Sequence, residues 1–157
     1  MRSMNRTAYG VIVIAAALLP PAALSAQGRH PRYLSARTDL RTAQRLARVG
    51  EQPNVALNLQ AAAREMDAAI KEIDRAAVLD RKDLMDNPPI DSNLARVDRF
   101  RKIVDLLRSA RADIQHEEDN PAAREWQTAA FKHIDEALKS VRRAAVDAKL
   151  DREIGDF

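Results

Sequence analysis

Apolar residues recur at intervals of three and four through most of this chain, which is the spacing of one face of an α-helix. Beyond residue 30 glycine is nearly absent, and alanine, leucine, arginine, aspartate and glutamate dominate. The pattern therefore predicts an all-α fold of four amphipathic helices. Prolines or capping residues mark their starts: we expect helices from Pro31, Pro53, Asp91 or Ser92, and Pro121, with Gly50 ending the first.

The spacing of these helices predicts how they are connected. Short links join the first helix to the second and the third to the fourth, whereas a longer link from Asp83 to Asp91 separates the two pairs. Helices joined by short links fold back on each other, so we predict an antiparallel up-down four-helix bundle. Aromatic residues make up only 4% of the chain, so the core should consist of small side chains.

The two predicted hairpins share a faint internal repeat. The segment MDAAIKEIDRAAV from Met66 resembles IDEALKSVRRAAV from Ile134, 68 residues later, and LRTA from Leu40 matches LRSA from Leu107, 67 residues later. Two similar helical hairpins would give a bundle with approximate two-fold symmetry. The alternative is that alanine-rich amphipathic helices resemble one another by composition alone.

The N-terminus has the order of a secretory signal peptide. Arg2 and Arg6 precede the apolar run 11–19, and a stretch of small residues ends at Ala26. The run is too short to span a bilayer, although an uncleaved anchor is the alternative. We therefore expect residues 1–26 to be a signal peptide, residues 27–157 to form the four-helix bundle domain without a membrane span, and the protein to be exported, either periplasmic or secreted.

Charge and cysteine content exclude several classes of protein. Removing Arg2 and Arg6 from the 26 Lys and Arg residues leaves 24, against 23 Asp and Glu, so the mature chain is nearly neutral. A generic nucleic-acid binder would need an excess of basic residues on one face. The chain has no cysteine, which excludes disulfides, c-type haem attachment, thiolate zinc sites and cysteine nucleophiles.

The sequence HEEDNP, from residue 116 to residue 121, has two interpretations. Asn120 precedes a proline and is suited to cap the fourth helix, so the segment is explained as a corner between two helices. Oxygen ligands with one imidazole could instead hold a divalent metal ion, although the segment lacks the fixed spacing of a calcium loop or zinc motif. Glu51, in the first corner, is expected at the same end of the bundle. The candidate ligands are His116, Glu117, Glu118 and Asp119, with His133 as a secondary candidate.

His133 falls at the edge of the apolar stripe of the fourth helix, at about the level of Asp39 and Glu65. We expect a bond from Asp39 to His133 between the first and fourth helices, and the alternative is a metal-ligand or proton-transfer role. A di-iron carboxylate centre is excluded, because it needs Glu-x-x-His on two helices and the second predicted helix has no histidine.

Five segments together resemble a family of small exported bacterial helical proteins of unknown function: HPRYLSARTDLRTA from His30, AAIKEIDRAA from Ala68, DRKDLMDNPPID from Asp80, DIQHEEDNP from Asp113 and HIDEA from His133. The resemblance covers nearly all of the mature chain and implies an exported protein with a helical fold, but no functional residue. A more distant similarity is to small periplasmic metal-binding four-helix proteins. Those are rich in histidine, whereas this chain has three.

No serine or cysteine nucleophile lies near a candidate base, and the chain has no glycine-rich phosphate loop. We therefore expect an exported, non-enzymatic helical protein that acts by contact with a protein partner in the cell envelope, with no nucleic acid bound and without a cofactor. The alternative is a low-capacity periplasmic protein that binds a divalent metal ion. Either could form an oligomer.

Overall fold

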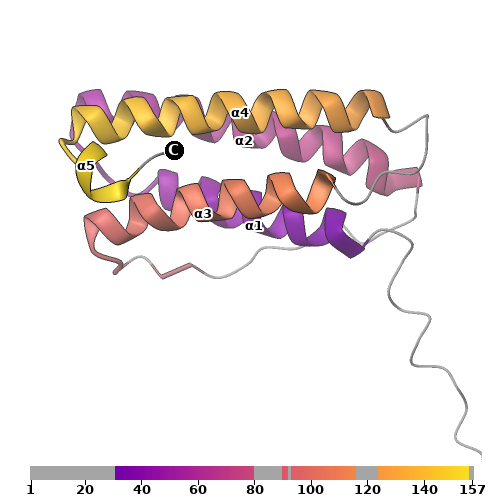
Figure 1. Ribbon diagram of the computed structural model, residues 1–157, viewed down its shortest axis with the longest axis horizontal. Coiled ribbons are helices and arrows are strands. Elements are labelled where there is room, and N and C mark those ends of the chain that lie inside the picture. Colours follow the sequence, from indigo (N-terminus) through magenta and orange to yellow (C-terminus); the bar gives the residue numbers. More distant parts are fainter. Residues whose placement is uncertain (1–30, 80–89, 92, 116–123, 156–157) are drawn as a thin grey trace, which may run out of the picture.

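The computed structural model describes residues 31–79, 90–91, 93–115 and 124–155 (Figure 1). The predicted signal peptide lies outside these ranges. The described part of the chain is helical and contains no strand, so the predicted all-α class is confirmed. Its helices are α1 Pro31–Ala47, α2 Pro53–Leu79, α3 Arg96–Gln115, α4 Arg124–Asp147 and the short α5 Asp151–Ile154.

The starts of α1 and α2 are those that the prolines predict, but α3 begins later than expected. The backbone N–H of Asn93 donates to Asp91 Oδ1 at 2.9 Å, and the first bond of the helix runs from Arg99 N–H to Ala95 O at 2.9 Å. The carboxylate of Asp91 is therefore used in a turn before the helix, and the predicted start at Asp91 or Ser92 is wrong. The predicted start of the fourth helix at Pro121 lies outside the described residues.

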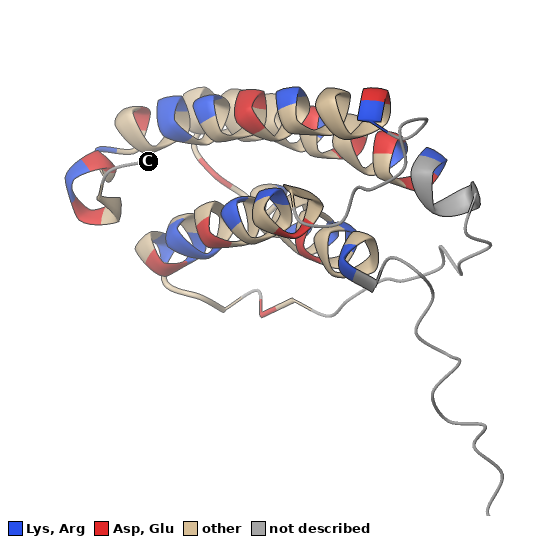
Figure 2. Cartoon of the chain, turned by 45° about the vertical axis from the view of Figure 1, so that its right-hand side comes forward, with Lys and Arg blue, Asp and Glu red and all other residues tan. Residues whose placement is uncertain are grey.

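The four long helices form a bundle in which each helix touches two of the others (Figures 1 and 2). α1 packs against α2 and α3, and α4 packs against the same two helices. The described residues make no contact between α1 and α4 or between α2 and α3, so these pairs lie on the diagonals. Figure 2 shows basic and acidic residues interspersed along the helices, as the nearly balanced charge leads one to expect.

The direction of α3 differs from the predicted up-down course. Glu51, just before α2, bonds to Arg96 and Arg99 in the first turn of α3, so α2 and α3 begin at the same end of the bundle. Residues 80–95 connect them and can reach about 50 Å when extended, whereas α3 is about 30 Å long. A link of this length can span the length of the bundle, so α3 can begin at the same end as α2.

The core of the described chain combines small and large side chains. Of its 28 buried hydrophobic residues, 11 are alanines and 14 are Leu, Ile, Met, Phe or Tyr, so the predicted small-residue core is confirmed only in part. α2 and α4 have the most extensive contact in the bundle. Small side chains let two helix backbones approach closely, and a close-packed interface of this kind leaves no room for a large internal cavity. The buried alanines of these two helices are Ala62, Ala63, Ala69, Ala130, Ala137, Ala144 and Ala145.

Buried positions repeat between the two hairpins at the offsets found in the sequence. Corresponding helices also touch, α1 with α3 and α2 with α4, which is the arrangement that a two-fold axis between the hairpins produces. Positions that correspond in the repeat are therefore buried in both hairpins. The corresponding buried residues include Tyr33 and Phe100, Leu40 and Leu107, Ala43 and Ala110, Ala62 and Ala130, and Ala69 and Ala137.

A tight turn that the sequence does not reveal ends α4. Lys149 has a φ of 59°, its N–H donates to Val146 O at 3.0 Å, and the N–H of Leu150 donates to Ala145 O at 2.8 Å. This is the Schellman motif, which usually carries glycine at the left-handed position. The turn buries Leu150 and leads into α5, which packs on α3 and α4.

Candidate functional site

His133 lies on α4 and bonds to a carboxylate of α2. Its Nδ1 is 2.8 Å from Glu65 Oε2, and the two side chains are 30% and 36% exposed. The predicted bond to Asp39 is wrong, because α1 and α4 are on opposite corners of the bundle. The expectation that His133 meets a carboxylate at this level is confirmed, with Glu65 in place of Asp39.

Of the five candidate metal ligands, the structure describes His133. His116, Glu117, Glu118 and Asp119 lie outside the described residues. Within the described ranges no three His, Cys, Asp or Glu side chains gather as a metal site would need, and His133 meets one carboxylate. Metal binding at residues 116–119 stays a prediction.

Glu51 was expected at the same end of the bundle as His116. It is bound at the first turn of α3, whereas His116 directly follows Gln115, the last residue of that helix. Gln115 therefore lies about 30 Å from Glu51, which is the length of α3. His116 itself lies outside the described residues, so the expectation for it stays a prediction.

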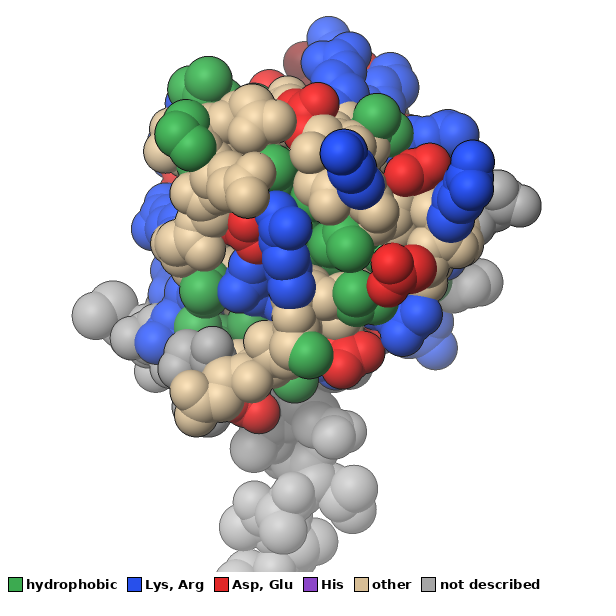
Figure 3. All heavy atoms as spheres, turned by 90° about the vertical axis from the view of Figure 1, so that its left-hand side faces the viewer, with side chains coloured by type: hydrophobic (Ala, Val, Ile, Leu, Met, Phe, Trp, Pro, Cys, Tyr) green, Lys and Arg blue, Asp and Glu red, His purple; other side chains and the backbone are tan. Residues whose placement is uncertain are grey.

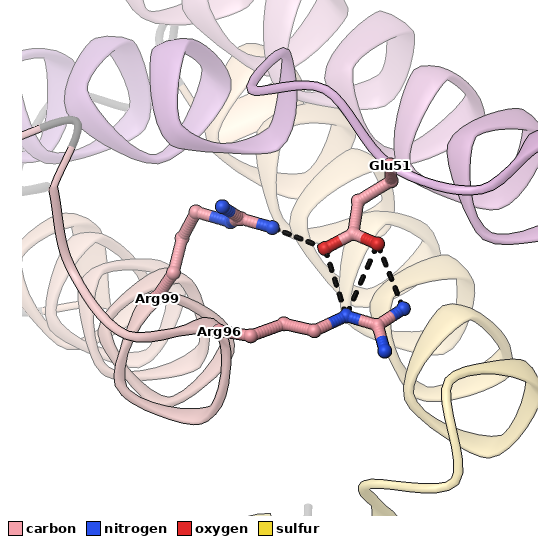
Figure 4. Close-up of polar contacts among 3 residues, drawn as sticks. All are labelled: Glu51, Arg96 and Arg99. Carbon is pink, nitrogen blue, oxygen red and sulfur yellow. Dashed lines mark hydrogen bonds and ion pairs between the residues drawn. The ribbon is translucent and has the colours of Figure 1, made fainter.

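Glu51 instead joins two arginines in a largely buried charged cluster (Figure 4). Arg96 donates from Nε to both carboxylate oxygens at 3.0 and 3.1 Å and from Nη2 to Oε2 at 2.7 Å. Arg99 donates from Nη2 to Oε1. The side chains of Glu51 and Arg99 are 5% and 8% exposed, and that of Arg96 is 36% exposed. The cluster fastens the corner between α1 and α2 to the start of α3.

Sequence reasoning missed this cluster, although one signal was present. Arg99 stands four residues before the buried Ile103, so it occupies the apolar stripe of α3, where a charged residue needs a partner. Among the described residues its Nε–H has no hydrogen-bond partner, and two guanidinium groups face one carboxylate. Figure 3 views this end of the molecule, where basic, acidic and hydrophobic side chains are intermixed.

A groove of about 470 Å³ lies between α1 and α3, next to this cluster. Its floor is apolar, since Leu46 is buried and Ile90 and Leu94 pack against the core from the segment before α3. Charged side chains of α3 form its rim. The lining residues are Thr42, Leu46, Ile90, Asp91, Leu94, Asp98, Arg101, Lys102 and Asp105.

The rim of this groove is partly fixed by internal bonds. Arg101 lies 3.4 Å from Asp98 Oδ1 and donates from Nη2 and Nε to Glu153 O at 2.5 and 3.2 Å, which ties α5 to α3. Lys102 and Asp105 are exposed one turn apart and carry opposite charges. The sequence did not point to this groove, because Ile90 and Leu94 belong to a link rather than to a helical stripe.

Glu136, on α4, has a displaced pKa. The hydrogen bond from Lys139 at 2.7 Å is the main reason that the pKa of Glu136 is lowered from its usual value. Glu136 is on the outer face of α4, so this displacement reflects surface charge pairing and does not mark an acid–base site.

No family model matches this chain, and no curated protein or solved structure matches it either. None of the helices in the described part of the chain is both long enough and apolar enough to span a bilayer.

Proposed function

We propose that this protein is an exported, non-enzymatic helical protein that acts by binding a protein partner in the cell envelope through the groove between α1 and α3. The observation that carries the proposal is the apolar floor of the groove with a charged rim, because protein interfaces combine an apolar centre with a polar edge. The repeating Ala-rich core serves as the rigid support for this surface.

The apolar side chains exposed in the floor of the groove are those that a partner would cover. Leu46 is already buried, so Ile90 and Leu94 supply the apolar surface that remains to be covered. Both side chains are already partly buried, so covering the remainder contributes only a fraction of the about 1.5–3 kcal/mol that complete burial of such a side chain gives. Lys102 and Asp105 then orient the partner, because opposite charges at fixed positions favour one direction of docking. A partner segment with an apolar side chain flanked by charged residues fits this surface.

Site-specific photo-crosslinking in the cells that produce the protein tests the proposal. A photoreactive amino acid at Asp105, on the rim, should give one discrete adduct of defined mass. The same amino acid at Gln60, which is exposed on α2 on the opposite corner of the bundle, should not give this adduct. Ile90→Ser should remove the adduct from the Asp105 variant, because it takes away apolar surface without changing a helix.

An adduct that also forms from Gln60, or that persists in Ile90→Ser, would contradict binding through this groove. The same preparation tests export, since mass spectrometry of the mature protein should find a chain that begins at Gln27. A chain that retains residues 1–26 would count against the signal peptide and in favour of an anchor.

A further inference from the structure

The outer face of α2 and α4 carries an exposed apolar pair. Among the described residues, Leu57 and Val146 are the large hydrophobic side chains that lie open to solvent, with 67% and 55% of their surface exposed. Hydrophobic residues scattered singly over a surface are normal, whereas adjacent ones mark a site of interaction. The position of these two residues relative to each other therefore decides whether they need an explanation.

Two bonds fix the relative direction of α2 and α4. Asn58 Nδ2, near the start of α2, donates to Asp147 Oδ2 at the end of α4, and the two atoms are 2.8 Å apart. Farther along, Glu65 of α2 meets His133 of α4. The later residue of α2 pairs with the earlier residue of α4, so these two helices run in opposite directions.

Leu57 and Val146 lie beside the bond between Asn58 and Asp147. Each precedes a member of that bond by one residue, which is about 100° of rotation around its helix. Because the helices run in opposite directions, this rotation turns both side chains to the same side of the seam, and their exposure makes it the outer side. The two side chains therefore form one apolar pair on neighbouring helices.

Unpaired arginines surround this apolar pair. Arg142 and Arg143 stand one turn before Val146 on α4, and Arg64 stands two turns after Leu57 on α2. All three are exposed, and within the described part of the chain none of them has a hydrogen-bond or ion-pair partner. Figure 3, in which α2 and α4 form the upper edge, shows hydrophobic and basic side chains reaching the surface along that edge. We call the apolar pair and these three arginines the α2–α4 patch.

The α2–α4 patch has a local excess of positive charge. Asp147 lies within it and accepts a hydrogen bond from Asn58, which is uncharged. Glu136, two turns before Arg143, already pairs with Lys139 at 2.7 Å. The chain as a whole has 26 basic against 23 acidic residues, so the attraction of an anionic partner depends on this local excess more than on the net charge.

The second hairpin shows that the bundle does not require this combination of residues. Glu125 stands at the position of Leu57, 68 residues later, and it is exposed. Asp74 stands at the position of Arg142, 68 residues earlier, and it bonds to Arg37 at 2.5 Å. The corresponding place at the other end of α2 and α4 is therefore polar and internally paired, and the apolar pair with its free arginines belongs to one end alone.

From these observations we infer that the α2–α4 patch docks on a membrane surface that contains anionic phospholipid. A protein at such a surface inserts apolar side chains just below the headgroups, while basic side chains bind the lipid phosphates. Leu57 and Val146 are the side chains that enter the interface. The groove proposed for a protein partner lies between α1 and α3, the other two long helices, so docking leaves that groove open.

Other occupants fit the patch less well. A symmetric dimer through this patch would bring Arg142 and Arg143 of one copy against those of the other, and like charges would then repel. A protein partner needs a complementary surface of about 800 Å² on each side, of which two projecting side chains supply little. A lipid surface needs no complementary shape and supplies the negative charge.

Binding of the purified protein to phosphatidylcholine vesicles, with and without phosphatidylglycerol, tests this inference. We expect phosphatidylglycerol to strengthen binding by about tenfold or more, because three arginines contribute. Binding should weaken as salt is added, because salt screens exposed charges. Residues 1–26, where they are retained, are the same in every variant and cannot produce a difference between variants.

Two double variants test the arginines. Arg142→Gln with Arg143→Gln should weaken binding to the phosphatidylglycerol vesicles about tenfold. The control Arg48→Gln with Lys102→Gln removes the same charge from exposed positions after α1 and on α3, and it should leave binding within about twofold of the parent. Circular dichroism melts check that both variants are folded.

The apolar pair is tested by substitution and by a fluorescent probe. Leu57→Ser with Val146→Ser should weaken binding about tenfold, because it removes the side chains that enter the interface. The chain has no cysteine, so a polarity-sensitive fluorophore can be attached at one introduced cysteine. At Gln60→Cys, one turn from Leu57, its emission should shift to the blue on vesicles, whereas at Ala112→Cys, exposed on α3, it should not change.

Three outcomes would overturn the inference: equal binding to both kinds of vesicle, equal weakening in the two charge variants, or a blue shift at Ala112→Cys without one at Gln60→Cys. Absence of binding to any vesicle would overturn it as well. In that case, a protein adduct from Gln60 that differs in mass from the Asp105 adduct would assign the patch to a protein partner. Failure here leaves the crosslinking result at Asp105 unaffected.

Discussion

Glu51 links the corner between α1 and α2 to the first turn of α3 through its bonds to Arg96 and Arg99. Replacing it by glutamine would leave Arg99 buried and Arg96 half-buried without a counter-charge. Breaking one side of a buried ion pair costs about 3–5 kcal/mol. We expect Glu51→Gln to lower the free energy of unfolding by an amount near the lower limit of that range, because Arg96 is partly solvated and glutamine keeps one acceptor oxygen.

Urea unfolding followed by circular dichroism measures this change. Glu136→Gln is the matched control, because it removes the charge of a carboxylate that pairs with Lys139 on the exposed surface, and its effect should be much smaller. Equal losses in the two variants would show that the cluster at Glu51 contributes no more than a surface pair.

The bond between His133 and Glu65 should be detectable as an energetic coupling. In a double-mutant cycle of His133→Ala and Glu65→Ala, we expect a coupling of about 0.5–1.5 kcal/mol, because the bond is a single hydrogen bond at a partly exposed position. A cycle that pairs His133→Ala with Asp39→Ala should give no coupling. Chemical denaturation measures both cycles, and coupling only to Asp39 would contradict the packing of α4 against α2.

Several helix starts and the buried face of each helix could be predicted from the sequence, because both depend on residues that are close together in the chain. Pro31 and Pro53 begin α1 and α2 as expected, and apolar residues at helical spacing form the core. The start of α3 was missed by several residues, because Asp91 bonds to the turn instead of to the helix. The turn at Lys149 was missed because a lysine there gives no sign of a left-handed backbone.

The contacts that depend on which helices are neighbours could not be predicted. The sequence could not decide between Asp39 and Glu65 as the partner of His133, because the choice depends on α4 packing against α2 and lying diagonally opposite α1. The cluster at Glu51 and the apolar floor at Ile90 follow from the direction of α3, which residues 80–95 leave open. Periodicity carries no information on that direction.

The alanines between α2 and α4 determine how closely these helices approach. Ala137 is fully buried, so Ala137→Leu adds three carbon atoms where there is no space. Overpacking of this kind costs about 1–3 kcal/mol. We expect that loss in the free energy of urea unfolding, whereas Ala112→Leu, at an exposed position of α3, should stay within about 0.5 kcal/mol of the parent. An unchanged stability in Ala137→Leu would indicate a void between the two helices.

For the molecule as a whole, metal ions provide the clearest test between its two proposed classes of function. A ligand that binds only the folded protein, at 100 times its dissociation constant, adds about 2.7 kcal/mol. At about 2–4 °C per kcal/mol for a chain of this size, Tm would rise by roughly 5–10 °C. We expect no rise that depends on His133, because within the described ranges His133 meets only Glu65 and no three ligand side chains gather. Residues 116–119 lie outside those ranges, and the same melts test them directly.

Thermal melts with EDTA, and then with copper, zinc, manganese and calcium in turn, measure this for the parent protein and for His116→Ala and His133→Ala. His133→Ala should lower Tm equally with and without each metal, because it breaks the bond to Glu65 rather than a metal bond. A rise for one metal that disappears in His116→Ala and persists in His133→Ala would place an ion at residues 116–119. That result would favour a metal-binding role, and a partner at the α1–α3 groove would then have to be tested on the metal-loaded protein.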